Sequence, residues 1–422
     1  MTRAPFADHP ARKLVADEVH ARPVVFVPAK GRVRRIAASL PEGPEAAARA
    51  MARFAQWCRD AGLPAPPGRQ HSYEAAGCSV TWELHTEFVT LSWLAPNPET
   101  AAWPEGIGLE ALADCTLLVA TRVDLVDAAE VPQKLIPTFN LGSLCVSWIE
   151  ARSGQIASDF KPDDDGFTRF EFACGGLSTV RRAVLVRRLL EIETYRTYTL
   201  LGLAPARERG PELARLEDEV ARTLEAMSEV DTVEEARVTL DLLHKMSVSA
   251  GRLGEATGFR FAATFAYADV LADRLGRLDE ESVGYASTLR RFLKNRIDPA
   301  IATCRAFEKR QEALAGKIDS AIRLLNTRIG LDVELQSRAL LEGISETGRS
   351  QYRLQKTVEG LSTIAISYYA IGIMSYVLGG AGLDTPTRQW TLALLVPAVL
   401  LLVWLALRRI QHRHGGGGAK LS

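Results

Sequence analysis

The sequence predicts an α+β domain, then an all-helical region and a long stalk helix, and finally a C-terminal pair of membrane-spanning helices. Three observations predict this order. Strand-like alternation of apolar residues is confined to about the first 175 residues, helical spacing replaces it afterwards, and two long uncharged runs lie near the C-terminus. At 422 residues with 47% hydrophobic residues, the chain is longer than one hydrophobic core usually holds, so we expect several structural units.

Charge and cysteine content narrow the class of protein. The chain has 51 Lys+Arg and 51 Asp+Glu, so it has no basic excess to neutralise phosphates, and we expect no nucleic-acid partner. The six cysteines are scattered without a C-x-x-C pair, which indicates a reduced compartment and neither a disulfide scaffold nor a zinc site. No apolar run follows the N-terminus, so no secretory signal is expected there.

Residues 1–175 are expected to form the α+β domain, on the cytoplasmic side. A short helix is expected at about 10–20, an extended segment at 23–28 and a second helix at 45–59. Val80, Trp82 and Leu84 alternate with polar residues, which is the period of a half-buried strand. Further strands are expected at 88–94, 116–123, 144–151 and 167–173. Together they predict one sheet covered by helices.

Residues 176–298 are expected to be a helical region. Apolar residues recur at heptad-like spacing over 213–227 and again over 233–250, which predicts helices that pack on one another. We expect Gly251, Gly254 and Gly258 to interrupt the second stretch. Asp298-Pro299 is typical of the entry to a new helix, since proline fits the first turn.

Residues 299–359 are expected to be a stalk helix that continues into the first span. Ala315, Ile318, Ile322, Leu325 and Ile329 keep a seam spacing, to be filled by the same chain or by symmetry mates. The same register then becomes polar, and it predicts either a solvated face or a hydrated vestibule formed by several copies. The vestibule candidates are Asp332, Gln336, Glu346, Ser350, Arg353 and Thr357.

Two uncharged runs, at 360–383 and 389–407, are long enough to cross a ~30 Å hydrocarbon layer as helices. Pro397 is expected to kink the second. Lys and Arg concentrate before the first run and in the tail at 408–422, while the connecting loop holds only Arg388. The positive-inside rule then predicts that both termini face the cytoplasm, and we expect the hairpin to lie in an inner membrane.

The first span carries a stripe of small or weakly polar residues on one side. The members are Thr363, Ser367, Ala370 and Met374. Small residues let membrane helices approach closely, so packing is one interpretation. A pore lining, in which hydroxyls, carbonyls and sulfur contact a partly hydrated ion, is the other.

Four motifs along nearly the whole chain resemble a bacterial family of uncharacterised membrane-anchored proteins, a domain of unknown function. They are His9-Pro10-x-Arg12 with Glu18-x-His20-Ala21-Arg22-Pro23; Trp82-Glu83-x-His85-Thr86-Glu87-Phe88; Leu190-Glu191-Ile192-Glu193-Thr194-Tyr195-Arg196; and Thr357–Ser362 followed by Ala365–Tyr369. The resemblance assigns these residues no chemistry.

The order of the parts also resembles the CorA-type divalent-cation transporters, which implies a pentamer around the first span. The signature of that family is Gly-Met-Asn at the outer end of the span, and this chain has Ser375-Tyr376-Val377-Leu378-Gly379-Gly380 there. The motif is absent, so the resemblance extends to architecture and not to cation selectivity.

The sequence contains no motif that predicts catalysis, a cofactor or a resident metal. His9, Glu18 and His20 lack compact ligand spacing, and Glu18 with Arg22 is equally explained as an i, i+4 ion pair. Asp163–Gly166 is expected to be a turn, because a calcium loop aligned on Gly166 would put Lys161 and Phe172 at ligand positions.

Two further patterns also have structural explanations. The Gly175-Gly176 turn is expected to lead into a helix capped by Ser178 or Thr179, although its amides could instead meet an anion. Glu191 and Glu193 point to different helix sides, so they do not form a carboxylate pair.

These observations predict a membrane homo-oligomer of CorA-like architecture, whose first span lines a path for inorganic ions while the α+β domain senses or regulates. The alternative is a membrane-tethered scaffold or signalling adaptor, and an enzyme with a non-motif site is a third hypothesis. The expected partners are the lipid bilayer, further copies of the chain and inorganic ions.

Overall fold

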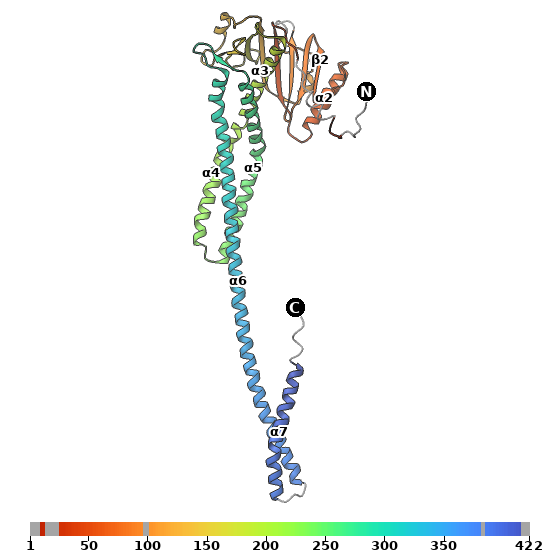
Figure 1. Ribbon diagram of the computed structural model, residues 1–422, viewed down its shortest axis with the longest axis vertical. Coiled ribbons are helices and arrows are strands. Elements are labelled where there is room, and N and C mark those ends of the chain that lie inside the picture. Colours follow the sequence, from red (N-terminus) through yellow and green to blue (C-terminus); the bar gives the residue numbers. More distant parts are fainter. Residues whose placement is uncertain (1–8, 13–24, 96–100, 381–384, 415–422) are drawn as a thin grey trace. The chain divides into compact units, whose positions relative to one another are not determined.

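The computed structural model describes residues 9–12, 25–95, 101–380 and 385–414 (Figure 1). The chain divides into two compact units. The first unit comprises Met1–Asp231 and Arg237–Ile322, and the second comprises Thr232–Ala236 and Arg323–Ser422. The boundaries expected at 175 and 298 therefore do not separate compact units, because the sheet shares its core with helices that follow both positions.

The first unit contains one nine-stranded mixed sheet with the order β2-β3-β4-β1-β5-β8-β7-β6-β9. Neighbouring strands pair antiparallel except β5 and β8, which are parallel. The strands are β1 (Gly31–Ser39), β2 (Gln70–Ala75), β3 (Cys78–Leu84), β4 (Phe88–Ala95), β5 (Thr116–Val126), β6 (Cys145–Ile149), β7 (Gly154–Ser158), β8 (Thr168–Ala173) and β9 (Glu281–Ser282).

The expected strands are confirmed as β3, β4, β5, β6 and β8, whereas β1, β2, β7 and β9 were not expected. β1 is an interior strand of the sheet, between β4 and β5. Its three arginines obscure the apolar alternation that marks a strand. Arg34 and Arg35 are both buried and point to opposite faces, because successive side chains of a strand alternate.

The helix α2 (Ala46–Asp60) covers one face of the sheet, and it confirms the helix expected at 45–59. Its buried residues recur every four positions, and Phe54 among them stacks on Trp82 with ring centroids 4.2 Å apart. The helix α3 (Thr179–Leu200) packs on the other face, mainly over β5 and β1. Short 3-10 helices occur at η1 (Leu109–Leu112), η2 (Gln133–Thr138) and η3 (Met227–Glu229).

The helices after α3 are α4 (Leu203–Ala226), α5 (Val233–Gly276), α6 (Leu289–Gly380) and α7 (Thr385–His414). The interruption expected at Gly251, Gly254 and Gly258 is wrong, since α5 continues through all three glycines. Buried residues on both sides of them keep the helix packed, and the backbone of Gly254 lies against the side chain of Gln311 on α6. Tertiary packing therefore outweighs the low helix propensity of glycine.

The expected helix start at Pro299 is also wrong. The helix α6 begins at Leu289 and continues to Gly380, so Pro299 lies in its interior. Leu289, Leu293 and Ile297 are buried in the same core as the sheet. That burial stabilises the helix across the missing backbone donor of proline.

The seam expected at 315–329 is filled within the chain. Ile318 and Leu325 are buried, whereas Ala315 is exposed. Of the two partners that the spacing left open, the same chain supplies the packing.

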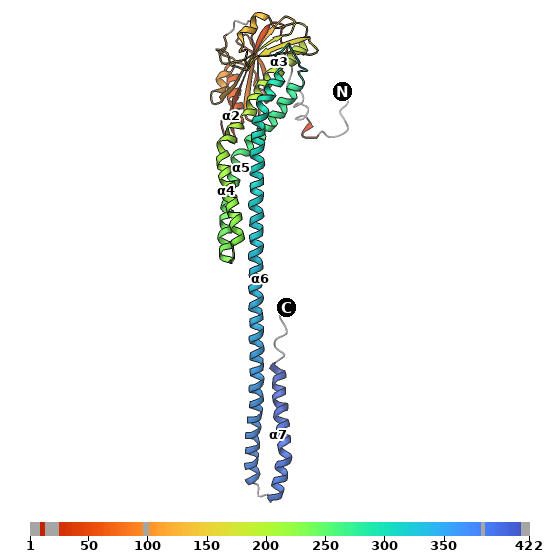
Figure 2. The ribbon, with the colours of Figure 1, turned by 90° about the vertical axis from the view of Figure 1, so that its left-hand side faces the viewer.

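In the second unit, α7 runs beside the C-terminal part of α6, as both views show (Figures 1 and 2). Ser367 of α6 and Val399 of α7 are buried, while most neighbouring side chains are exposed. Ser367 therefore lies on the side of α6 that faces α7.

We predict that Gly202→Ala destabilises the first unit by about 1–3 kcal/mol through overpacking. A Cβ atom at Gly202 would lie 3.1 Å from Cβ of Thr264 and 3.3 Å from the Cys304 sulfur. Gly254→Ala is the matched control, because its added carbon meets only the flexible end of Gln311. Denaturant titration of tryptophan fluorescence in detergent should separate them, and equal stability of both variants would contradict the packing explanation.

Candidate functional site

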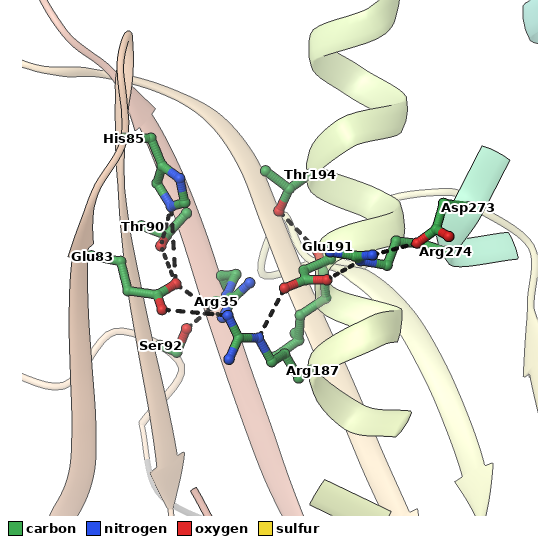
Figure 3. Close-up of polar contacts among 11 residues, drawn as sticks. Arg35, Glu83, His85, Thr90, Ser92, Arg187, Glu191, Thr194, Asp273 and Arg274 are labelled. Atoms are coloured by element: carbon green, nitrogen blue, oxygen red, sulfur yellow. Dashed lines mark hydrogen bonds and ion pairs between the residues drawn. The ribbon is translucent and has the colours of Figure 1, made fainter. Parts of the chain in front are cut away.

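A chain of alternating charges connects the sheet to α3 and α5 in the first unit (Figure 3). It begins on β1, where Arg35 donates a 2.7 Å hydrogen bond to Ser92 of β4. Its guanidinium also lies 3.7 Å from the carboxylate of Glu83 on β3. Arg35 and Glu83 are both buried, so each charge depends on the other for compensation.

The charge chain continues across α3. Arg187 lies 3.8 Å from Glu83 and donates a 2.9 Å hydrogen bond to Glu191 one turn later. The second oxygen of Glu191 accepts from Arg274 of α5, which also contacts Asp273. Burial alone would raise the pKa of Glu191, but the hydrogen bond from Arg187 and the nearby arginine charges outweigh it and lower that pKa.

His85 lies at the sheet end of this network. Its Nε2 is 3.3 Å from the Thr90 hydroxyl and 3.9 Å from Glu83, and its ring stacks on Phe88 at 4.3 Å. The Thr90 hydroxyl in turn donates to Glu83 at 3.4 Å. The motif residue His85 therefore touches the same carboxylate as Arg35 and Arg187.

A small half-open cavity of about 70 Å³ adjoins Arg35, Glu83 and Arg187. Val27, Val33 and Leu190 supply part of its apolar wall, and Gln70, Ser79, Thr81 and Ser92 supply polar groups. The volume is enough for water molecules or one small polar group, and it is less than half of a typical ligand pocket.

The other motif residues of α3 and the β3–β4 turn also make polar or aromatic contacts. Glu87 forms two hydrogen bonds with Arg260 of α5, at 2.6 and 3.2 Å. Tyr195 stacks on Tyr267 of α5 at 5.7 Å. The nearly fully buried Glu193 pairs with Arg196, whose guanidinium also lies over the ring of Phe160. The contacts of Glu87 and Tyr195 attach α5 to the sheet and to α3, whereas the Glu193–Arg196 pair lies within α3.

The N-terminal motif is described only in part. His9 is exposed, and its Nδ1 accepts a hydrogen bond from the amide of Ala11. Arg12 is also exposed. Glu18, His20 and Arg22, together with most of the helix expected at 10–20, lie outside the described residues.

A second charged cluster lies on the α2 face of the sheet, where β1, β5 and β8 adjoin. Arg32 pairs with Asp124, which also contacts Arg122, and Arg169 lies 3.8 Å from Glu171. Burial raises the pKa of Glu171 to about 7, assisted by the charge of Asp124 and opposed by the nearby arginines. This carboxyl group therefore titrates near neutral pH.

The cysteines are poorly suited to nucleophilic chemistry. Burial raises the pKa of all six thiols, to about 12 for Cys145 and about 11 for Cys174. The thiolate is the reactive form, so these side chains are protonated at neutral pH. Within the described ranges, no group of three or more His, Cys, Asp or Glu side chains could hold a metal ion.

Two local interpretations of the sequence are confirmed. Asp163 accepts backbone hydrogen bonds from Asp165 and Phe167, which closes the expected turn. Ser178 caps α3 by accepting from the amide of Arg181.

The vestibule and pore-lining candidates lie on α6. The vestibule candidates are exposed except for the half-buried Asp332, namely Gln336, Glu346, Ser350, Arg353 and Thr357. Among the pore-lining candidates, Ser367 is buried, Thr363 and Ala370 are half-buried, and Met374 is 36% exposed. The hydroxyl of Thr363 bonds to the carbonyl of Glu359 within the helix.

Four residues of the charge chain were not predicted as site residues, namely Arg35, Glu83, Arg187 and Arg274. Glu83 lies inside a motif between Trp82 and His85, which is a signal that could have identified it. Arg187 and Glu191 have i, i+4 spacing. The positions of Arg35 and Arg274 follow only from the sheet order and the docking of α5.

These features define an α+β protein with a buried arginine–carboxylate network, a 92-residue helix and a C-terminal helical hairpin. The chain belongs to the family described as a protein of unknown function (DUF3422), whose match covers residues 7–414. This confirms the family resemblance of the motifs. No curated protein matches the chain. The resemblance to CorA-type transporters is not supported by this assignment.

We predict that Glu191→Gln destabilises the first unit by about 1–3 kcal/mol, because two half-buried arginines lose the charge of the buried carboxylate that they share. Glu334→Gln removes the exposed i, i+4 partner of Arg338 and should change stability by less than about 0.5 kcal/mol. The free energy of unfolding, measured from tryptophan fluorescence, tests both. Equal effects would show that the network does not hold the unit together.

Glu171 predicts a pH dependence of stability. Its pKa rises from 4.5 to about 7 on folding, so the folded state retains a proton that the unfolded state has lost. The contribution of Glu171 to stability is fully present below pH 4.5 and is lost as the pH rises to about 7, a change of about 3 kcal/mol. Glu171→Gln should remove that part of the slope. Parallel stability curves for both proteins over this range would contradict the assignment.

Proposed function

We propose that this protein is a membrane-anchored scaffold or signalling adaptor of the bacterial inner membrane. The α6–α7 hairpin anchors the chain, and the first unit binds partner proteins on the cytoplasmic side. No transport step and no enzymatic step belong to this proposal.

The exposed apolar character of the hairpin carries the proposal. The most apolar windows of α6 and α7 have mean hydropathies of 1.5 and 2.1, with 6% and 0% of their residues buried. Ile373 and Leu401 illustrate this, being 66% and 60% exposed. Water contact with so many large apolar side chains is unfavourable, and a lipid bilayer removes it.

The orientation follows from the flanking charges. Arg349, Arg353 and Lys356 precede the first span, and Arg408 and Arg409 follow the second. Basic flanks remain in the cytoplasm, so both chain termini lie on that side and the short connection between the spans lies outside.

The contacts of the motif residues support a binding role over a chemical one. Glu87 pairs with Arg260 and Glu191 pairs with Arg274, which connects α5 to the sheet and to α3. Glu193 and Arg196 pair with each other inside α3. A unit whose helices are held by such a network presents a defined surface to a partner. The six cysteine thiols, which are protonated at neutral pH, supply no reactive thiolate either.

The second candidate function is ion conduction along the stripe that contains Thr363 and Ser367. Its support is the weakly polar character of the stripe. The burial of Ser367 toward α7 favours helix packing within one hairpin, because a pore axis requires the stripe to face other copies.

We predict that the wild-type protein stays in the membrane pellet during alkaline carbonate extraction, and that the double variant Ile373→Arg with Leu401→Arg is released into the supernatant. Each arginine near the middle of a span costs about 2.5–3.5 kcal/mol of insertion free energy. Leu335→Arg is the control, because Leu335 is equally exposed but lies in the stalk before the spans. Retention of the double variant in the membrane fraction, or release of the control, would overturn the anchor assignment.

The same purified chain distinguishes the two candidate functions when it is reconstituted in liposomes. An anchor gives the ion leak of empty liposomes, with or without Ser367→Trp. A leak above that background which Ser367→Trp abolishes would replace the adaptor proposal with the conduction proposal.

A further inference from the structure

The stalk part of α6 carries a second apolar stripe, on a different side from the seam at 315–329. Val333 is 48% exposed, and the five large apolar residues that continue its face are 56–71% exposed. These five are Leu340, Ile344, Leu354, Val358 and Leu361. We infer that this stripe is the seam of a parallel, two-stranded coiled coil formed with a second copy of the chain.

The residue types along the stripe match a two-stranded seam. With Val333, Leu340, Leu354 and Leu361 at heptad position d, position a holds the apolar Ile344 and Val358 and the polar Ser337 and Gln351. A β-branched residue at a with leucine at d favours two parallel strands. The register also continues through Ala365 and Tyr368 into the proposed first span.

The middle of the stripe is polar, and its residues favour pairing with an identical copy in the same register. Thr347 occupies position d, and its hydroxyl already bonds to the carbonyl of Gly343 at 2.8 Å, so it can be buried without losing that bond. Gln351 occupies position a, where a parallel copy in register places the same amide opposite it. Ser337, two heptads earlier, is a second polar residue at position a. Polar residues at a select register and orientation at a cost in stability.

Charge avoids the seam, and beyond Glu334 at position e it also avoids the flanks. From residue 335 to 360, positions e and g are uncharged, with small or polar residues at most of them. All charges in this range fall on the outer positions b, c and f, namely Arg338, Glu342, Glu346, Arg349, Arg353, Lys356 and Glu359. A second copy therefore meets the stripe without burying a charge or facing a like one.

The hairpin leaves the stripe uncovered. Thr363 and Ser367 face α7 and occupy outer heptad positions f and c. Thr363 follows Leu361 by two residues, which is about 200° around the helix. The face used by α7 and the face offered to a second copy thus lie on opposite sides of α6.

The area of the stripe explains why the second copy must share the membrane. Burial of an aliphatic side chain removes roughly 60–120 Å² of apolar surface, so six partly exposed ones remove on the order of 200–450 Å² per copy. A stable interface between free proteins buries about 1,200–2,000 Å² in total. Two chains inserted in one bilayer are held parallel and concentrated, which compensates for the smaller area. Only this step depends on the proposed membrane anchoring.

The test is disulfide cross-linking of the full-length chain in native membranes with copper phenanthroline. Leu354→Cys places a thiol at position d, and Thr347→Cys repeats the test at another d position. Arg349→Cys at position f is the matched control, and the wild type reports any background from the six native cysteines. Both d variants should form a covalent dimer at least roughly ten times faster than the control, because a disulfide needs Cα atoms within about 7 Å.

Three outcomes are decisive. Equal cross-linking at positions d and f, or none at d, would overturn the coiled coil. Native mass measurement of membrane-extracted protein showing three or more copies would overturn the two-stranded state. The soluble fraction of each sample is assayed in parallel, so a chain found there contradicts the membrane anchor and not the seam.

Discussion

Charged side chains buried between a sheet and its covering helices must be compensated, and this constraint organises the first unit. Arg35 on β1, Glu83 on β3, and Arg187 with Glu191 on α3 each supply the charge that the next one needs. Arg274 extends the chain to α5. A helix that shifted along the sheet would leave a charge buried alone, so the network fixes how the elements dock.

In the second unit, the side chains that need a partner are apolar and exposed, whereas in the first unit they are charged and buried. Water cannot stabilise the leucines of the hairpin or of the stalk stripe, and the polar stalk face needs no partner. Lipid around the spans and a second copy along the stripe are therefore complementary proposals. They use different faces of α6, because α7 occupies the face that contains Ser367.

Family membership identifies the motifs of this chain but does not assign them a role. The match over residues 7–414 confirms that the motifs belong together. Their contacts in the first unit are ion pairs and stacked rings that position helices, including Glu87 with Arg260 and Tyr195 with Tyr267. A motif can therefore mark structural positions as readily as chemical ones, and its residue types alone do not distinguish these cases.

The sequence by itself determined the α+β class, α2, five strands, a cap by Ser178 or Thr179, the Asp163 turn and the apolar C-terminal helices. Each depends on residues close together in the chain, through periodicity, capping or length. Only the tertiary structure decided that the arginine-rich segment at 31–39 is an interior strand of the sheet and that α5 and α6 continue through Gly254 and Pro299. It also decided which charges meet. Those outcomes depend on burial against distant residues, which outweighs local preference and leaves no local pattern in the sequence.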